Sequence, residues 1–293
     1  MSETTRGSIK FDLRTFLPHI SEQQIKALME GASVETGDAE SAPTVSCVLP
    51  FGEARRRKPA LKSIVQFTQQ TYLHKQLVIA NTTGTPLLSQ TVEGITELML
   101  NEELSIGMLR NRGIEAAAGT WIKHWDDDDY FDINLLSYMM AHRVPGKALM
   151  LRYQLRVDSR KATAYRHDDP AGIPNTILFP RTEARYGDID AGDDVAFVLA
   201  NWSEKCVVLS NAAFPSTMLS VAVYHGGNVT SERSFMGEYS EPQHAAKWYL
   251  SAEEQPALIK VLEGFGLKTT VKTTAPENEP MVAPPVPDAQ PVA

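Results

Sequence analysis

Short apolar runs and helical patterns alternate along the chain between about residue 43 and residue 237. Continuous apolar runs of this length are typical of strands that are buried on both faces of a parallel sheet. They predict strands at residues 45–49, 75–80, 105–109 and 121–125. Apolar residues at helical spacing predict helices between them, at residues 59–68, 92–99 and 114–118. The alternation predicts an α/β fold with a Rossmann-like, mostly parallel sheet, right-handed crossovers and flanking helices.

The two ends of the chain differ from this central region. A capping box at residues 21–24 predicts a short helix, and the polar residues 31–42 are typical of a linker. After residue 268 the chain is rich in Thr, Pro and Glu, which cannot build a core. We therefore expect an N-terminal helical extension with linker (1–42), one α/β domain (43–240, with halves 43–132 and 133–240), a C-terminal helical segment (241–267) and a disordered, Pro-rich C-terminal tail (268–293).

Charge and cysteine content narrow the class of protein. The net charge is −8, and the only basic run is Arg55–Lys58, so composition gives no support to broad nucleic-acid binding. Cys47 and Cys206 lie in apolar, strand-like runs and are interpreted as core residues of a reduced, cytoplasmic protein. The sequence contains neither a signal peptide nor eighteen consecutive apolar residues, so we expect no transmembrane segment.

Four consecutive aspartates, Asp126 to Asp129, follow the last predicted strand and precede a helical pattern near Asp132. Crowded carboxylates repel one another unless a cation lies among them, and Mg²⁺ and Mn²⁺ prefer such oxygen ligands. The alternative is a solvated acidic turn in which Asp129 or Asp132 caps the next helix. Pro50, Asn81 and Asp126 each follow a predicted strand, and ligands of such sheets bind beyond the carboxyl ends of the strands. We therefore expect their loops to meet at one edge.

An ordered series of segments resembles the family-two glycosyltransferases of the GT-A fold. The series consists of Val45–Pro50, Gln70-Thr71-Tyr72, Leu77–Asn81, Arg110–Gly119 and Trp125–Tyr130. Each segment is weak alone, but their order and spacing are specific. The resemblance continues loosely through Tyr186-Gly187-Asp188 and Gly192-Asp193-Asp194 to Tyr224–Asn228, and it does not cover residues 1–40 or the chain after about residue 240.

The resemblance implies a nucleotide-sugar donor, with a UDP-sugar favoured, and a Mn²⁺ or Mg²⁺ ion that stabilises the leaving diphosphate. The implied metal ligands are Asp128, Asp126 and His225. The implied donor-binding residues are Pro50, Phe51, Glu53, Asn81, Arg110, Asp126 and Asp127. Core packing is an equal alternative for Phe51, and the amide of Asn81 stands where the family commonly has an aspartate. Arg112 and the Arg55–Lys58 run are interpreted as solvated.

Inverting transfer needs a carboxylate that takes the proton of the acceptor hydroxyl. The resemblance assigns this role to Asp194, with Asp193 and Asp188 as alternatives, although acidic residues at a helix start also serve as caps. The acceptor is open between a carbohydrate, a lipid-linked sugar, a protein and a hydroxymethylated DNA base of phage type. The competing functions are a nucleotidyltransferase and a noncatalytic sugar-nucleotide-binding module.

Overall fold

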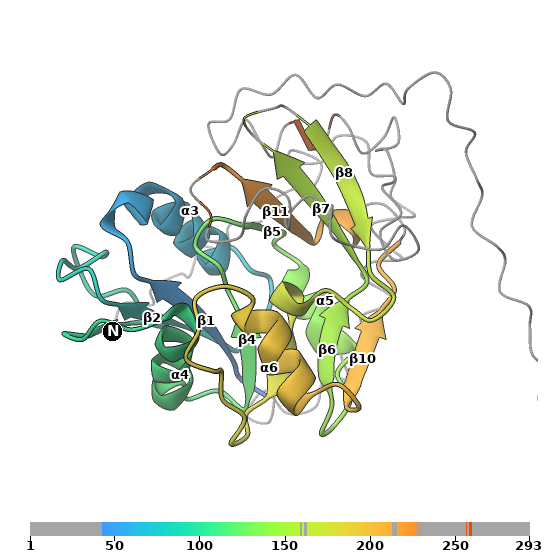
Figure 1. Ribbon diagram of the computed structural model, residues 1–293, viewed down its shortest axis with the longest axis horizontal. Helices are drawn as coiled ribbons and strands as arrows, with labels where there is room; N and C mark the ends of the chain where they lie inside the picture. The colour runs from blue at the N-terminus through green and yellow to red at the C-terminus, as the bar shows by residue number, and fades with distance from the viewer. Residues whose placement is uncertain are drawn as a thin grey trace, which may run out of the picture.

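A computed structural model describes residues 43–158, 160, 163–212, 216–226, 228, 256, 258 and 259. The first and larger of its two sheets has seven strands in the order β10-β6-β9-β4-β1-β2-β3 (Figure 1). These strands are β1 (Val45–Phe51), β2 (Lys75–Asn81), β3 (Ile95–Met99), β4 (Trp121–His124), β6 (Ala148–Leu151), β9 (Leu178–Pro180) and β10 (Cys206–Leu209). Only β9 runs antiparallel to its neighbours, β4 and β6. The predicted α/β fold with a mostly parallel sheet is confirmed.

Helices cover both faces of this sheet. They are α3 (Arg57–Thr68), α4 (Ile106–Ala116), α5 (Leu135–Ala141) and α6 (Asp193–Asn201), together with the short 3₁₀ helices η1 (Ala54–Arg56), η2 (Pro174–Thr176) and η3 (Ser216–Met218). Alternate residues of β1 enter two different cores, because successive side chains of a strand point to opposite faces. Cys47 and Leu49 pack with residues of α3 and α5, whereas Val48 packs with residues of α4 and α6. The result is a three-layered domain.

A second sheet lies beside the first and was not predicted. Its order is β5-β11-β7-β8, formed by β5 (Tyr130–Phe131), β11 (Ser220–Tyr224), β7 (Tyr153–Asp158) and β8 (Thr163–Asp168). Within it, β11 pairs in parallel with β7 and antiparallel with β5. Because β5 directly follows the aspartate run, the second sheet begins at the end of that run.

Two neighbouring predictions were wrong. Residues 92–99 were expected to form a helix, but Ile95–Met99 form β3, which pairs in parallel with β2. Residues 105–109 were expected to form a strand, but α4 begins at Ile106, and the hydroxyl of Ser105 caps it by accepting the N–H of Met108. Pairing with an already formed sheet overrides the weak helical spacing of the first segment. The cap signal of serine accounts for the second.

The buried face of α3 also differs from the prediction. The helical spacing of Leu61, Ile64, Val65 and Thr68 predicts that they share the buried side, but Leu61 and Val65 are 38% and 52% exposed. The buried side chains of the helix are Ala60, Ser63, Ile64 and Phe67. The helix is rotated by about one residue because Phe67 packs edge-on against Trp125.

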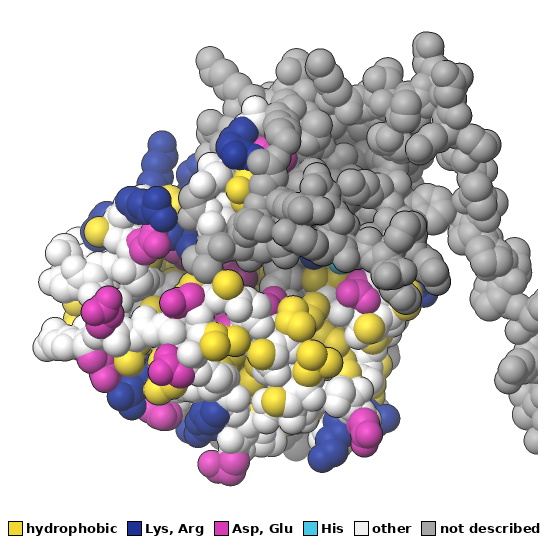
Figure 2. Space-filling view, in the orientation of Figure 1, with side chains coloured by type: hydrophobic (Ala, Val, Ile, Leu, Met, Phe, Trp, Pro, Cys, Tyr) yellow, Lys and Arg dark blue, Asp and Glu magenta, His cyan; other side chains and the backbone are white. Residues whose placement is uncertain are grey.

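Other features of the described chain agree with the sequence. Cys47 is buried in the core, and both it and Cys206 are free thiols. Within the described residues no helix is long and apolar enough to cross a membrane. Figure 2 shows apolar side chains on the face of the molecule where α6 lies, and Leu199 of that helix is 66% exposed. The predicted N-terminal helix, the linker and the Pro-rich tail lie outside the described residues.

Candidate functional site

The aspartate run is buried, which rules out the solvated turn. It leaves β4 at the edge where that strand ends, and Asp127, Asp128 and Asp129 are 5%, 9% and 6% exposed. The hydroxyl of Ser63 on α3 donates to the backbone carbonyl of Asp126 over 2.8 Å and so ties the run to the neighbouring helix. Burying several carboxylates is costly unless cations or hydrogen-bond donors compensate them. The groups around each carboxylate therefore determine how the cost of its burial is compensated.

Arg56 is one of the compensating cations. Its Nη2 lies 2.5 Å from both Asp127 Oδ1 and Asp128 Oδ2. Burial opposes its charge, but Asp128 and Asp127 outweigh this effect and raise the pKa of Arg56. Conversely, burial and the neighbouring Asp128 raise the pKa of Asp127 well above its usual value. The solvated loop expected for this basic run is thus wrong for Arg56, although Arg55 is exposed and pairs with Glu53.

Arg110 on α4 is the second cation, and it joins the two halves of the domain. Its Nη2 lies 3.0 Å from Asp126 Oδ1, and its Nε donates to Asp193 Oδ2 at the start of α6 over 2.7 Å. Burial lowers the pKa of Arg110, but Asp126 and Asp193 outweigh it and raise that pKa above the usual value. Burial likewise raises the pKa of Asp126, but His124 and Arg110 hold it well below its ordinary range. Arg112, as expected, is at the surface, where it pairs with Glu102.

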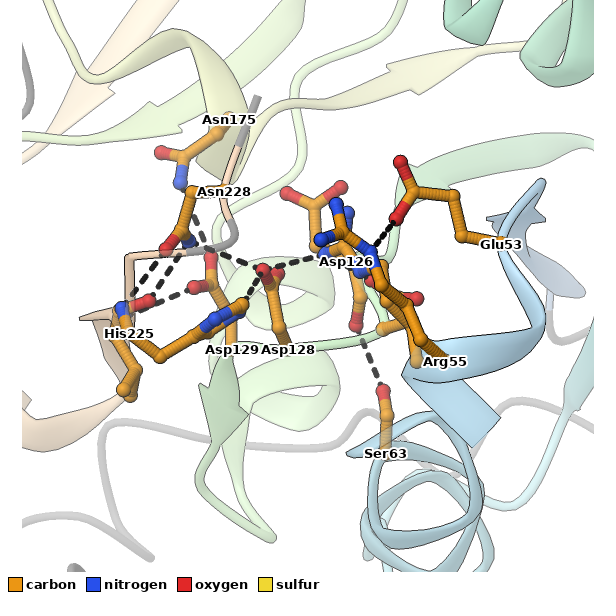
Figure 3. A network of polar contacts seen from close by, with 12 residues as sticks. Glu53, Arg55, Ser63, Asp126, Asp128, Asp129, Asn175, His225 and Asn228 are labelled. Carbon is orange, nitrogen blue, oxygen red and sulfur yellow. Dashed lines mark hydrogen bonds and ion pairs between the residues drawn. The ribbon is translucent and has the colours of Figure 1, made fainter. Parts of the chain in front are cut away.

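Asp128 and His225 are far apart in the sequence but lie next to each other in the structure (Figure 3). His225 Nε2 lies 3.1 Å from Asp128 Oδ2, and Asn228 Nδ2 donates to the same oxygen over 3.1 Å. Asn228 Oδ1 also accepts the backbone N–H of His225 and holds that turn. The loop after β11 is thereby attached to the aspartate run.

The predicted metal ligands do not all converge. Asp128 and His225 are adjacent, and a carboxylate suits Mn²⁺ or Mg²⁺, but Asp128 Oδ2 is also bound by Arg56 at 2.5 Å and by Asn228. Asp126 does not join them, because its Oδ1 is bound by Arg110 and by His124 Nε2 at 3.0 Å. Among the described residues, no three His, Cys, Asp or Glu side chains are grouped so that they could hold an ion. An ion held by Asp128 and His225 would have to displace Arg56 from Asp128 Oδ2, and a diphosphate would supply further ligands.

Asp129 connects the run to the second sheet. Its Oδ1 accepts the backbone N–H of Val223 in β11 over 3.2 Å, and its Oδ2 accepts from Asn175 Nδ2 over 3.3 Å. Burial and the charge of Asp128 raise the pKa of Asp129 well above its usual value. Asp126 and Asp129 thus also position other elements. Asp129 does not cap the next helix, whereas Asp132, the other candidate cap, accepts the N–H of Asn134 directly before α5.

A cavity of about 630 Å³ opens beside these groups. Its wall includes Arg56, Arg110, His124, Asp126, Asp128 and Asp129 on one side and Asp190 to Val195 at the start of α6. The wall is completed by Ile106, Gln154, Arg156, Ala222, Asn228 and the segment Ile173-Pro174-Asn175. This volume is in the range of small-molecule sites. The wall combines acids, arginines and amides, so it suits a polar ligand.

Asp194 is the candidate base that faces this cavity. Its Oδ1 accepts the N–H of Val195 over 2.8 Å, and burial, followed by the charge of Asp193, raises the pKa of Asp194. A carboxylate with a raised pKa is a better proton acceptor. Asp193 also lines the cavity, but it is bound by Arg110. Asp188 is exposed, accepts from the hydroxyl of Ser105 and is not part of the wall, so the structure speaks against it as the base.

The remaining donor-binding candidates do not line this cavity. Phe51 is 1% exposed and belongs to the core, which was the alternative reading for it. Asn81 has no free hydrogen-bonding position, because its amide nitrogen donates to Thr85 and Glu97 and its oxygen accepts twice from Thr83. Its amide therefore shapes the loop after β2. Three further candidates, Pro50 in β1, Glu53 beside Arg55 and Asp127 under Arg56, are likewise absent from the wall.

Several residues of the site were not predicted from the sequence. Arg56, His124, Gln154 and Asn175 line the cavity, yet none carries a motif. Arg56 lies 71 positions before Asp127, so only the coincidence of a basic run and an acidic run at two strand ends hinted at their pairing. Gln154 and Asn175 belong to the unpredicted second sheet and to η2.

Comparisons with known proteins add a distant likeness. No family model matches the chain, and no curated protein matches it. Among solved structures, S. aureus TarS 1–349 in complex with UDP-GlcNAc is similar with a TM-score of 0.49 and 14% identity over 75% of this chain and 66% of that chain. The same protein in complex with UDP gives 0.47 and 14% over 76% and 80%. TarS 1–349 without a named ligand gives 0.45, and the chain covers 65% of its length. A likeness of this degree establishes neither a family nor an activity.

Proposed function

We propose that the protein is a glycosyltransferase that moves a sugar from a nucleotide-sugar to an acceptor hydroxyl with inversion. A UDP-sugar is the favoured donor, on the strength of the sequence resemblance. The observation that carries the proposal is that one cavity is shared by three acids of the aspartate run (Asp126, Asp128 and Asp129), three arginines and the carboxylate of Asp194. Such a cavity provides a charged region for a leaving diphosphate and, on a different element, a base.

The site must first stabilise the leaving group. When the glycosidic bond to the diphosphate breaks, negative charge builds on the phosphate oxygens, and fixed cations lower the barrier by stabilising that charge. Arg56 and Arg110 supply two guanidinium groups in the wall of the cavity. Arg56 has the more exposed side chain of the two. It suits this role because a guanidinium presents a fork of donors to phosphate oxygens.

A divalent ion would share this role. Asp128 and His225 would hold Mn²⁺ or Mg²⁺, which when bound supplies electrostatic stabilisation to the diphosphate. Asp126 then acts through Arg110 and His124 and keeps those side chains in place.

The acceptor places the second demand. As its oxygen attacks the anomeric carbon, its proton must leave, and Asp194 is positioned in the cavity wall to take it. Arg110 binds Asp193 next to it and thereby fixes the start of α6 relative to the aspartate run. This link keeps the base at a constant place with respect to the leaving group, which is how orientation contributes to rate.

Thermal unfolding with a panel of nucleotide-sugars, with and without Mn²⁺, tests donor binding. A UDP-sugar is expected to raise the unfolding temperature more in the presence of the ion, because a ligand of the folded state stabilises it. Asp128→Ala is expected to remove the dependence on the ion. No stabilisation by any nucleotide-sugar, with or without Mn²⁺, would contradict the proposal.

A turnover assay that detects released nucleotide tests the base. Asp194→Asn is expected to bind the donor as the native protein does and to lose transfer by about 10²–10⁴-fold. Asp188→Asn is the matched control, since Asp188 is an exposed acid of the preceding loop outside the cavity wall. Full transfer by Asp194→Asn would overturn the assignment.

A further inference from the structure

We propose that Gln154 is a specificity-determining residue of this cavity, and that its side-chain oxygen accepts a hydrogen bond from a hydroxyl of a sugar or polyol acceptor. The inference rests on the proposed function. Gln154, on β7, is fully buried and lines the cavity, and its Oε1 has no hydrogen-bond partner among the described residues. A buried, unpaired amide oxygen is costly, so its presence in a cavity wall indicates that a ligand satisfies it.

A chain of hydrogen bonds fixes which end of the amide is left without a partner. Asp129 is already the acceptor for the N–H of Val223, and Asn175 turns its Nδ2 toward the other oxygen of that carboxylate. The Oδ1 of Asn175 therefore faces Gln154 and accepts from its Nε2 over 3.3 Å. The same Nε2 donates to Ser220 Oγ over 2.9 Å, so both of its hydrogens are used. Only the oxygen is left for a ligand.

The position and the chemistry of this oxygen favour the acceptor over the donor's diphosphate. Asn175 lies in η2, which packs against α6, the helix that carries Asp194. Gln154 is thus linked through Asn175 to η2 beside the base, and through the same residue to Asp129, whereas Arg56 pairs with Asp127 and Asp128. An amide oxygen repels phosphate oxygens and accepts from a hydroxyl. Next to it, Ile173 and Pro174 offer an apolar surface for the carbon side of a sugar or polyol.

Glycerol, a minimal molecule with adjacent hydroxyls, serves as the probe. Crystals of the full chain soaked in glycerol are expected to show a hydroxyl oxygen about 2.7–2.8 Å from Gln154 Oε1. Gln154→Met keeps the size of the side chain and removes the oxygen. It is expected to weaken glycerol binding, followed by ligand-observed NMR, by about five- to tenfold. Gln70→Met is the control, since Gln70 is equally buried but its Oε1 already accepts the N–H of Leu136.

The outcomes separate this inference from the proposed function. It is overturned if glycerol is absent from Oε1 in the native crystals, or if folded Gln154→Met binds glycerol as the native protein does. It is also overturned if Gln154→Met loses stabilisation by a UDP-sugar that the native protein shows, because Oε1 would then serve the donor. If no nucleotide-sugar stabilises either protein while glycerol occupies Oε1, the proposed function fails and the hydroxyl site remains.

Discussion

Replacing Arg110 by methionine is expected to destabilise the fold strongly. The guanidinium is buried and bound to Asp126 over 3.0 Å and to Asp193 over 2.7 Å. Asp193 is 5% exposed, so the variant leaves one buried carboxylate without its cation and weakens the hydrogen bonding of another. Removing one partner of a buried ion pair costs about 3–5 kcal/mol. In a domain of this size the loss corresponds to a fall in unfolding temperature of roughly 6–20 °C.

Arg112→Met is the matched control for Arg110→Met. It lies two residues further along α4, makes the same kind of pairs with Glu102 and Glu115, but its side chain is 37% exposed. Surface pairs are worth about 0–1 kcal/mol, because water and salt screen them. Urea unfolding followed by tryptophan fluorescence measures the free energy of both variants. A loss for Arg110→Met within about 1 kcal/mol of that for Arg112→Met would refute the reasoning.

The loss of stability in Arg110→Met is expected to depend on pH. Because the folded pKa of Asp126 is depressed, its ionised form contributes stability above its unfolded pKa of about 3.9. That contribution is lost as the pH falls through the folded pKa. Arg110 is one of the two groups that depress the pKa, so the stability difference between native protein and Arg110→Met is expected to narrow as the pH falls below about 4. A difference that stays constant with pH would show that packing, not charge, is lost.

Three further outcomes follow from the site and the core. The acid limb of the turnover profile is expected above the ordinary carboxyl pKa of about 3.9, because burial raises the pKa of Asp194 and only its ionised form accepts a proton. Gly107→Ala is expected to cost about 1–3 kcal/mol in urea unfolding, since its Cβ would lie 2.0 Å from the carbonyl oxygen of Gly187, whereas Gly187→Ala meets no atom within 4 Å. Cys47, whose pKa burial raises to about 12, is expected to resist thiol reagents until the protein unfolds, and labelling in the native state at the rate of an exposed thiol would contradict this.

The sequence predicted the elements whose local pattern agrees with their final surroundings. β1 and β2 contain apolar runs that are buried on both faces, β4 is buried although it includes Lys123 and His124, and α6 begins at the predicted pair of acids. β3 could not be predicted, since Ile95–Met99 carries helical spacing and becomes a strand only by pairing with β2. Its strand conformation comes from a neighbour, not from its own residues.

The candidate site was predicted only in part, because some of its contacts also come from distant parts of the chain. The aspartate run, Asp194 and His225 stand out as residue types next to strand or helix ends, and the structure brings all of them near the cavity or its wall. Arg56 reaches Asp127 and Asp128, and Arg110 reaches Asp193, through contacts that span more than 60 residues of chain. No local pattern contains that information.

The tie between Asp129 and Val223 has a consequence for how ligands would meet the protein. This buried bond, with that of Asn175, attaches the second sheet to the end of β4, while Arg110 attaches α6 to the same place. Three sides of the hollow are therefore set at fixed separations when the chain folds. A ligand that binds does not have to bring mobile walls of the cavity together. The entropy of ordering these walls has already been lost during folding. Selectivity then arises from shape and from the bonds a guest can complete, rather than from a closing movement of these elements.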